Sequence, residues 1–347
     1  MTNVHKCAPH AAALYCTPRL IVADGVHLLW FECMKAVPAL HIVERALASG
    51  VLKPGAQVVE TSSGTFALGL ALVCRQFDLD CVIVCDPAID TRLQRRLTDL
   101  GCRIEMVNKC AVDGGYQSAR LERLTEILNQ NPDAFWPRQY DNPDNPASYA
   151  TLAEALIERL GPRLALVATV GSGGSSAGFG RPLRTLDAST PVIGVDTFRS
   201  VIFGQPDGSR LLRGLGNSLV PVNIDHTLFD DVHFLDAPTG FGATRALHSS
   251  HGIFAGPTTG AAWWVGRWVA RQYPNRKVIA IGPDDGHRYI DTIYSDDWLK
   301  AKAPCSNLSK NPDEGQEVAT CKPPWARFSW RRRLRQDVIS QDLAHVG

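Results

Sequence analysis

Short apolar runs alternate with longer amphipathic segments from about residue 17 to residue 295. Most runs are apolar throughout and rich in β-branched residues, as strands buried on both faces of a parallel sheet are. We expect strands near residues 57–59, 81–84, 103–107, 165–168, 192–195 and 278–281, and helices over residues 38–49, 66–77, 91–100, 116–129 and 260–272. Strands that alternate with helices predict an α/β fold with a doubly wound sheet, in two lobes.

The pattern changes beyond about residue 302, where the chain becomes polar and contains several prolines. Such a segment has little apolar surface to bury, so we expect residues 301–347 to form a disordered tail. The basic run at residues 331–335 could attract nucleic acid. Short basic runs in tails are usually solvated surface, so no nucleic-acid partner is expected.

Composition narrows the function classes. The 347 residues are 45% hydrophobic and carry a formal net charge of +1, which favours a compact protein with a small ligand. Ten cysteines show no Cys-x-x-Cys pair, so we interpret them as reduced thiols. The first nine residues lack a secretory pattern, and no apolar run reaches the roughly 18 residues of a membrane span. A cytoplasmic protein without membrane contact is therefore expected.

Three predicted strands end in clusters of glycine, serine and threonine that open a helix. They lie at residues 60–65, 169–176 and 256–260. Ligands of open α/β sheets bind at such carboxyl ends of strands. These three loops are therefore the first candidates for a site.

The second loop contains Gly171, Ser172, Gly173, Gly174 and Ser175. Its glycines let the backbone approach an anion, its hydroxyls can donate to phosphate oxygens, and the following helix adds its N-terminal dipole. The loop could instead serve only tight strand–helix packing. It is neither a Walker loop nor a dinucleotide fingerprint, so neither ATP nor NAD is implied.

The other two loops have both a ligand-binding and a structural interpretation. Ser62, Ser63, Gly64 and Thr65 offer hydroxyls and backbone donors that suit a carboxylate, or a helix cap. Thr258 could likewise cap a helix or bond a ligand heteroatom. Lys35 precedes a predicted helix in an apolar segment that would lower its pKa, as a Schiff-base lysine requires. A surface lysine is the alternative.

Taken in order, five segments resemble the cysteine synthase and cystathionine β-synthase family of pyridoxal-phosphate (PLP) enzymes. They are Cys-Met-Lys-Ala-Val at residues 33–37, Ser-Ser-Gly-Thr at 62–65, Gly-Ser-Gly-Gly-Ser at 171–175, Gly-Pro-Thr-Thr-Gly at 256–260 and Pro-Asp-Asp-Gly-His-Arg-Tyr at 283–289. The family's Gly-Leu-Leu-Lys-Pro-Gly segment also appears at the expected distance, as Gly-Val-Leu-Lys-Pro-Gly at residues 50–55.

The resemblance implies a fold-type II PLP enzyme, similar to the tryptophan synthase β chain, with the cofactor between two open twisted α/β sheets. It implies a larger PLP-binding domain over residues 1–38 and 141–300 and a smaller domain over residues 39–140. By resemblance, Lys35 holds the cofactor and carries the α-carbon proton, Gly171 to Ser175 bind its phosphate, and Thr258 bonds the pyridine nitrogen. Thr65 replaces the family asparagine at the cofactor. Ser62, Ser63, Gly64, Thr65 and Gln139 would bind the substrate carboxylate.

A narrower resemblance points to family members that condense O-phospho-L-serine with L-glutamate for 2,3-diaminopropionate and siderophore synthesis. It rests on residues 113–116, 135–140, 200–204, 252–256 and 294–299. Glutamate brings two carboxylates, for which Arg138, Arg199 and Arg213 are available. The resemblance thus implies a transferase for small amino acids, working as a homodimer.

Two alternatives remain open. One is sulfide addition to an O-acetyl- or O-phospho-L-serine, which is the ordinary cysteine synthase reaction. The other is a catalytically silent family member that acts as a binding or regulatory subunit. It is suggested by Thr65 in place of asparagine and by the absence of the glycine pair that precedes the lysine in the family.

Overall fold

The structure is a computed structural model that describes residues 10–111, 115–304 and 308–344. Two of the cysteines, Cys7 and Cys305, and Asp113 and Gly114 of one quoted segment lie outside the described residues. The chain divides into two compact units. Unit 1 contains residues 1–18 and 31–138, and unit 2 contains residues 19–30 and 139–347.

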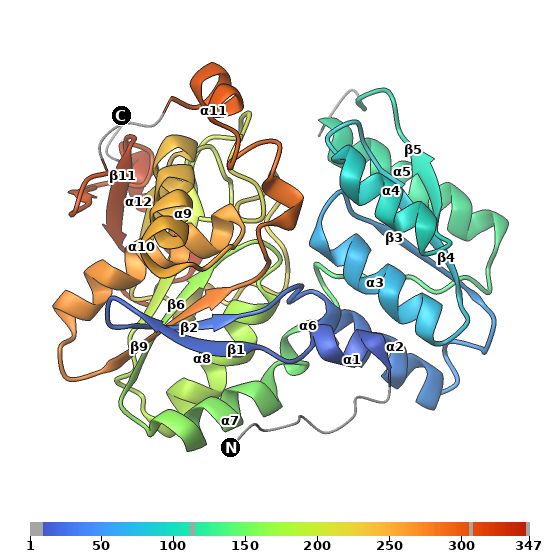
Figure 1. Ribbon diagram of the computed structural model, residues 1–347, viewed down its shortest axis with the longest axis horizontal. Coiled ribbons are helices and arrows are strands. Elements are labelled where there is room, and N and C mark those ends of the chain that lie inside the picture. Colours follow the sequence, from blue (N-terminus) through green and yellow to red (C-terminus); the bar gives the residue numbers. More distant parts are fainter. Residues whose placement is uncertain (1–9, 112–114, 305–307, 345–347) are drawn as a thin grey trace. The chain divides into compact units, whose positions relative to one another are not determined.

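Unit 1 is built on a parallel sheet in the order β3-β4-β5, at the right of Figure 1. Its strands are β3 (Gln57–Thr61), β4 (Asp80–Cys85) and β5 (Arg103–Met106), and its helices are α1 (Ala11–Tyr15), α2 (Ala36–Ala48), α3 (Thr65–Gln76), α4 (Thr91–Asp99) and α5 (Gly115–Gln130). All six helices and strands predicted between residues 38 and 107 are present, with ends that shift by at most two residues.

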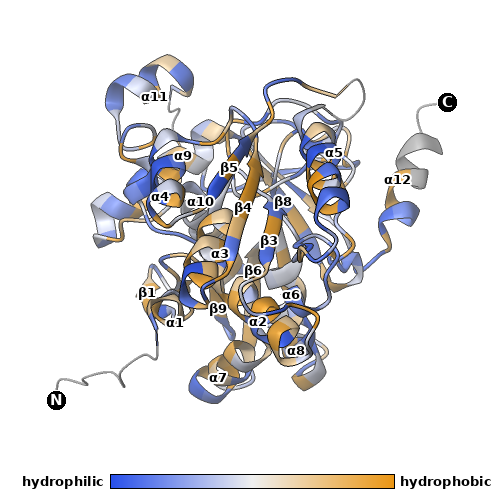
Figure 2. Cartoon of the chain, turned by 90° about the vertical axis from the view of Figure 1, so that its right-hand side faces the viewer, coloured by the Kyte–Doolittle hydropathy of each residue, from blue (hydrophilic) through white to orange (hydrophobic). Residues whose placement is uncertain are grey.

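Alternation along the strands of unit 1 explains its layers. Val58, Cys81 and Ile83 point into a core shared with α2 and α3, whereas Val59 and Val82 contact the apolar stripe of α5. The sheet is therefore covered on both faces, as its continuous apolar strands indicate. Figure 2 shows α3 as mainly hydrophobic, which agrees with the burial of most of its side chains.

Unit 2 contains an eight-stranded mixed sheet in the order β1-β2-β9-β6-β7-β8-β11-β10. Its strands are β1 (Arg19–Ala23), β2 (Val26–Trp30), β6 (Leu164–Thr169), β7 (Val192–Thr197), β8 (Asp231–Leu235), β9 (Lys277–Gly282), β10 (Asp313–Glu314) and β11 (Trp325–Ser329). The central strands β2, β9, β6, β7 and β8 are parallel. This arrangement confirms the α/β prediction. At one edge of the sheet β1 forms a hairpin with β2, and at the other edge β11 and β10 follow β8.

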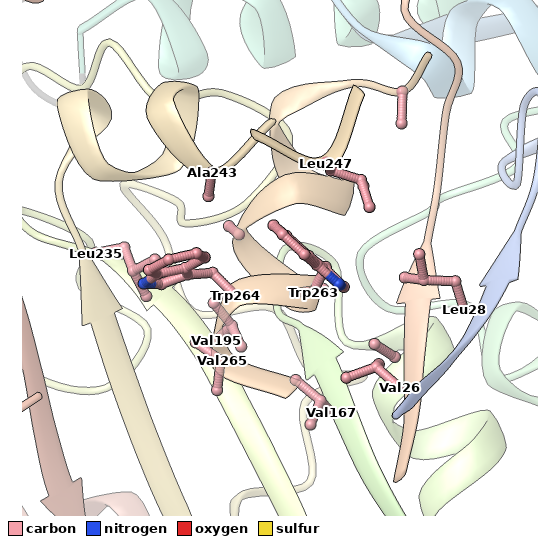
Figure 3. Close-up of a cluster of buried hydrophobic side chains, with 14 of the residues drawn as sticks. Val26, Leu28, Val167, Val195, Leu235, Ala243, Leu247, Trp263, Trp264 and Val265 are labelled. Carbon is pink, nitrogen blue, oxygen red and sulfur yellow. The ribbon is translucent and has the colours of Figure 1, made fainter. Parts of the chain in front are cut away.

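Helices cover both faces of this sheet. They are α6 (Asp144–Ala147), α7 (Ala150–Leu160), α8 (Gly174–Leu186), α9 (Ala237–His251), α10 (Pro257–Gln272), α11 (Asp296–Lys302) and α12 (Arg335–Ala344), with short 3-10 turns η1 (His226–Leu228) and η2 (His287–Tyr289). Figure 3 shows Trp263 and Trp264 of α10 packed among Val167, Val195 and Val26 of the strands. On the opposite face, Gly180 of α8 lies against Leu166 and Val192.

Two boundaries differ from those expected. Residues 10–18 and 31–38 belong to unit 1, because α1 packs on α2 and α3 in its core. Residues 308–344 are not a disordered tail, because β11 pairs with β8 and α12 follows it. A few large side chains order this segment: Trp325 and Trp330 are both fully buried. Within the described residues, none of the helices is long and apolar enough to cross a membrane.

Candidate functional site

Lys35 stands at the N-terminal cap of α2 in unit 1 and is half-buried. Two contacts fix its backbone. The Cys33 thiol, two residues before it, donates to the carbonyl of Thr65 at 3.5 Å. Gly69 of α3 faces the Lys35–Ala36 peptide so closely that a β-carbon there would lie 2.7 Å from its atoms. The lysine backbone is therefore held against the first turns of α3.

Burial lowers the pKa of Lys35 from its ordinary value to about 8, and a charged Cys33 thiolate would partly oppose this shift. A lysine with this pKa has a substantial fraction of neutral amine near physiological pH, whereas an ordinary surface lysine has almost none. The environment of Lys35 thus suits a nucleophilic amine. It does not suit the alternative of an ordinary surface lysine.

The serine loop at residues 62–65 joins β3 to α3 in the same unit. The Ser62 hydroxyl accepts from the amides of Gly64 and Ala67, at 3.2 and 3.3 Å, so it caps α3 as the structural interpretation predicts. Ser63 has a different environment. Its hydroxyl accepts from Arg120 Nη1 at 2.9 Å and from the Asp86 amide at 3.4 Å.

Arg120 of α5 brings a buried positive charge to this loop. Its Nη1 also lies 2.9 Å from Asp86 Oδ2, and both side chains are about nine-tenths buried. Its Nε is buried without a hydrogen-bond partner in the part of the chain that the structure describes. Sequence reasoning missed this residue. The signal was its position on the apolar stripe of α5, four residues before Leu124 and seven before Ile127.

The glycine loop at residues 171–175 follows β6 in unit 2 and opens α8. Gly173 has φ +85°, and a β-carbon there would lie 2.6 Å from Asn223. At Gly174, a β-carbon would lie 2.0 Å from Oδ1 of the fully buried Asn145. Neither position accepts a side chain. Gly171 is different, since its nearest neighbour would be 3.6 Å away.

Asn145, which sequence reasoning also missed, links two predicted site residues. Its Nδ2 donates to the Gln139 carbonyl at 2.6 Å and to Ser172 Oγ at 3.4 Å. Asn223 Nδ2 donates to the same carbonyl at 3.2 Å. Gln139 is therefore fixed beside the glycine loop by two buried amides.

Thr258 lies at the N-terminus of α10 in unit 2 and is buried. Its hydroxyl donates to the Arg213 carbonyl at 3.3 Å, a long bond that leaves the hydroxyl able to turn to a ligand atom. Gly214 has φ +92° and approaches Thr258 so closely that a β-carbon would lie 2.4 Å from Oγ1. The carbonyl of Gly214 also faces Gly171.

The Pro-Asp-Asp-Gly-His-Arg-Tyr segment supports the start of α10. The Asp284 carbonyl accepts from Trp30 Nε1 at 3.1 Å and Thr259 Oγ1 at 3.4 Å, and its carboxylate accepts from Tyr289 at 2.6 Å. Burial raises the pKa of Asp284 to about 6. Asp284 therefore helps to hold the N-terminus of α10, where Thr258 lies.

The predicted site residues fall into two groups. Lys35, the serine loop and Arg120 belong to unit 1, whereas the glycine loop, Gln139 and Thr258 belong to unit 2. Of the arginines suggested by sequence, Arg138 lies over the Trp136 ring in unit 1, while Arg199 and Arg213 are in unit 2. The group in unit 1 presents an amine and hydrogen-bond donors that suit a carboxylate, and the group in unit 2 presents a glycine loop at a helix N-terminus.

An amine of lowered pKa, a glycine loop and a buried hydroxyl are the features expected of an enzyme that uses a phosphate-bearing aldehyde cofactor. The family model described as "Pyridoxal-phosphate dependent enzyme" matches residues 31–284. The chain belongs to this family, and its cofactor is pyridoxal 5′-phosphate.

Two curated relatives are both named N-(2-amino-2-carboxyethyl)-L-glutamate synthase. The one from Cupriavidus metallidurans is 37% identical over 288 residues, which is 80% of this chain and 84% of the relative. The one from Ralstonia nicotianae is 37% identical over 272 residues, which is 77% of this chain and 80% of the relative. Together with the family match, they indicate a β-substitution on serine.

Solved structures show the same fold at lower identity. An O-acetylserine-dependent cystathionine β-synthase from Helicobacter pylori matches with a TM-score of 0.77 and 24% identity, over 84% of this chain and 100% of that one. A cysteine synthase from Entamoeba histolytica matches with a TM-score of 0.77 and 21% identity, over 89% and 95%. The fold-type II prediction is confirmed.

The residues present fit the cofactor. Glycines whose β-carbons would collide with Asn145 and Asn223 keep the loop backbone open, and Ser172 and Ser175 beside them are buried hydroxyls. The thirteen-residue helix α8 contributes its N-terminal donors. In unit 1, the lowered pKa of Lys35 suits a bond to an aldehyde.

Proposed function

We propose that this enzyme replaces the phosphate of O-phospho-L-serine with the amino group of L-glutamate, giving N-(2-amino-2-carboxyethyl)-L-glutamate. The product would serve 2,3-diaminopropionate and siderophore or other secondary-metabolite synthesis. The names of the two curated relatives support this choice. The observation that carries it is the buried guanidinium of Arg120 at Ser63.

Arg120 favours an anionic substrate for a physical reason. The Ser62–Thr65 loop alone offers neutral donors, which are enough for one carboxylate. The Arg120 guanidinium is paired with the Asp86 carboxylate, but its Nε is a charged donor that has no hydrogen-bond partner among the described residues. Phosphate binds such a planar cation strongly, whereas an acetyl ester gains little from it. This unused donor therefore favours phosphoserine over acetylserine.

Each group of residues would have a separate task. When bound, the cofactor withdraws electrons from the substrate α-carbon, which permits loss of the β-substituent. Lys35 Nζ would hold the cofactor and carry the α-carbon proton, for which its pKa near 8 is suited. Residues 171–175 would bind the phosphate, and Thr258 would face the pyridine nitrogen. A hydroxyl there leaves that nitrogen largely unprotonated.

The substrate carboxylate would be bound by the Ser62 to Thr65 loop with help from Gln139. Thr65 would contact the cofactor in place of the family asparagine. Ser63 is held by Arg120 and the Asp86 amide, so its hydroxyl is oriented before substrate arrives. Such preorganisation lowers the entropic cost of binding. We further propose a cytoplasmic homodimer.

Substrate competition tests the reaction. Purified enzyme is given O-phospho- or O-acetyl-L-serine with labelled glutamate, ammonia or sulfide, and products are identified by mass spectrometry. We expect the phosphoserine–glutamate pair to give the highest kcat/KM. Rapid cysteine formation without an amine product would establish the cysteine synthase alternative. Absence of any product, with cofactor bound, would establish a catalytically silent protein.

The role of Arg120 is tested with a matched arginine. Arg120→Gln should lower kcat/KM for O-phospho-L-serine by about 10²-fold or more, as expected for a lost charged contact, and should affect O-acetyl-L-serine much less. Arg123→Gln is the control, because Arg123 lies on the same helix but pairs with Glu105 and Glu126. Equal losses for both esters would show that Arg120 only supports the loop.

A further inference from the structure

The C-terminal segment at residues 318–339, called here the C-terminal strap, lies beyond the family match, which ends at residue 284. It is nevertheless built into unit 2. Strand β11 pairs antiparallel with β8 from Trp325 to Ser329. Trp330, which is fully buried, packs edge-on against Phe203 with 5.1 Å between ring centroids. The strap is therefore part of the unit 2 core.

Four contacts join the strap to the turn at residues 200–205. Arg335 donates from Nε to the Ile202 carbonyl at 3.1 Å and from Nη2 to the Val201 carbonyl at 2.9 Å. Gln205 Nε2 donates to the Val318 carbonyl. Gly204 has φ +94° and faces Ile339, so a β-carbon there would lie 3.0 Å from Cγ1. Residues near both ends of the strap therefore contact the same turn.

The turn at residues 200–205 is hydrogen-bonded to the segment at residues 213–217. The Val201 amide donates to the Asn217 carbonyl at 2.9 Å, and the Asn217 amide donates to Ser200 Oγ at 3.1 Å. The Gly216 amide donates to the Val170 carbonyl at 2.8 Å. Val170 directly precedes the glycine loop. Two of these links join backbone to backbone and the third joins the Asn217 backbone to the Ser200 side chain, so a shift of the turn moves the segment with it.

The far end of this segment reaches two residues of the unit 2 group. The Arg213 carbonyl accepts from the Thr258 hydroxyl, and Gly214 approaches both Thr258 and Gly171. Hydrogen bonds from Arg335 to Val201 and from Val201 to Asn217, followed by the backbone of residues 213–217, therefore connect Arg335 to the residues around Thr258.

We propose that the C-terminal strap is a positioning element for the cofactor, with Arg335 as its main anchor. The strap fixes the turn at residues 200–205, and that turn sets the segment at residues 213–217 against Thr258 and Gly171. The inference rests on the cofactor contact proposed for Thr258. Arg335 suits the task because its planar fork donates to two adjacent carbonyls at once.

Hydrogen exchange and cofactor affinity together test this proposal. Arg335→Ala, Arg335→Lys and the exposed Arg331→Ala are compared with the native protein in the apo form. In Arg335→Ala, we expect the amides of Val201, Gly216 and Asn217 to exchange about tenfold faster, as loss of a charged hydrogen bond allows. The dissociation constant for PLP should rise several-fold. Lysine should restore part of both effects, and Arg331→Ala should change neither.

The outcomes separate the positioning role from simple instability. Faster exchange confined to the turn and residues 213–217, with the melting temperature lowered by only a few degrees, supports the proposal. Unchanged exchange there, or exchange raised equally throughout unit 2, overturns it. If Arg335→Ala lowers the yield of folded protein, Ile339→Ala serves as the milder variant and is judged by the same readouts.

Thr258→Ala, measured in parallel, distinguishes failure of the inference from failure of the proposed function. If Thr258→Ala weakens PLP binding and Arg335→Ala does not, the strap is not a positioning element and the role of Thr258 stands. If neither variant weakens PLP binding although exchange rises in Arg335→Ala, Thr258 is not the cofactor contact and the positioning link is overturned with it.

Discussion

Gly69 touches Lys35 through the backbone: a β-carbon at Gly69 would lie 2.7 Å from the carbonyl carbon and oxygen of Lys35. This distance is shorter than van der Waals contact. Helix α3 and the lysine segment therefore meet at a point where only glycine fits. The position of the lysine amine depends on a residue that has no side chain.

Gly69→Ala should displace Lys35 and weaken PLP uptake. The added methyl meets backbone rather than a movable side chain, so we expect a loss of about 1–3 kcal/mol in unfolding free energy. Visible absorbance of bound PLP should fall at a given cofactor concentration. The control is Gly242→Ala in α9, whose methyl would meet only the end of Leu308 at 3.0 Å. Native PLP uptake in Gly69→Ala would contradict the prediction.

Lys35→Ala should yield a folded protein without the visible absorbance of covalently held PLP and without product formation. In the native apo protein, the rate of PLP uptake should rise with pH up to about 8 and level off above it, because the neutral amine is the reactive form and burial lowers the pKa of Lys35 to about 8. Stopped-flow absorbance measures this rate. A rise that continues beyond pH 10 would indicate an ordinary lysine.

Substitutions in the glycine loop can distinguish a glycine required for ligand contact from one required for protein packing. At Gly171 a methyl would have its nearest protein neighbour at 3.6 Å, whereas at Gly174 it would collide with Asn145 at 2.0 Å. Gly171→Ala should keep the native melting temperature but raise the PLP dissociation constant, because the methyl enters the space of the phosphate. Gly174→Ala should lower both stability and affinity. Calorimetry and PLP titration distinguish the two, and native affinity in Gly171→Ala would exclude phosphate binding there.

Asp196 should make unfolding depend on pH. Its carboxyl is fully buried at the end of β7, and burial raises its pKa to about 7. The folded state therefore prefers the protonated form. The resulting stabilisation is complete below about pH 4 and is lost as pH rises to 7. Asp196→Asn should exceed the native protein in unfolding free energy at pH 8, by on the order of 2–4 kcal/mol, but not at pH 4.

Asp187→Asn is the control, because the pKa of Asp187 is shifted in the opposite direction to that of Asp196. Hydrogen bonds from Ser189 and Arg276 lower the pKa of Asp187 to about 2. Its stabilisation is present at neutral pH and is lost as pH falls through about 2, so Asp187→Asn should be less stable than the native protein at pH 8. Urea titrations at pH 4 and pH 8 measure both variants. A similar response to pH in the two would show that Asp196 does not titrate as stated.

Much of the fold was predictable because its strands are short, apolar and bounded by glycine and serine clusters. Residues 81–84 and 278–281, for instance, lie within β4 and β9. The hairpin of β1 and β2 was missed although Asp24 and Gly25, both with positive φ, form its turn. This Asp-Gly pair is a hairpin signal, but the exposed Val22 and short strands obscured it.

Lys35 and the three loops were predictable from residue types and order. Arg120 and Asn145 were not, because their importance comes from contacts between elements distant in sequence. Arg120 meets Ser63 across 57 positions, and Asn145 meets Ser172 across 27. The ordered C-terminal segment was missed for a similar reason, since its order depends on pairing with β8 rather than on its own composition.

The pairing of β11 with β8 also affects how the chain can be shortened. Without residues 325–329, β8 would become the border of the sheet and present its amides and carbonyls to solvent. Such a border recruits strands from other molecules. A protein truncated at the end of the family match would therefore be prone to aggregate even if its catalytic residues were intact, and the native C-terminal residues act as a built-in protection of solubility.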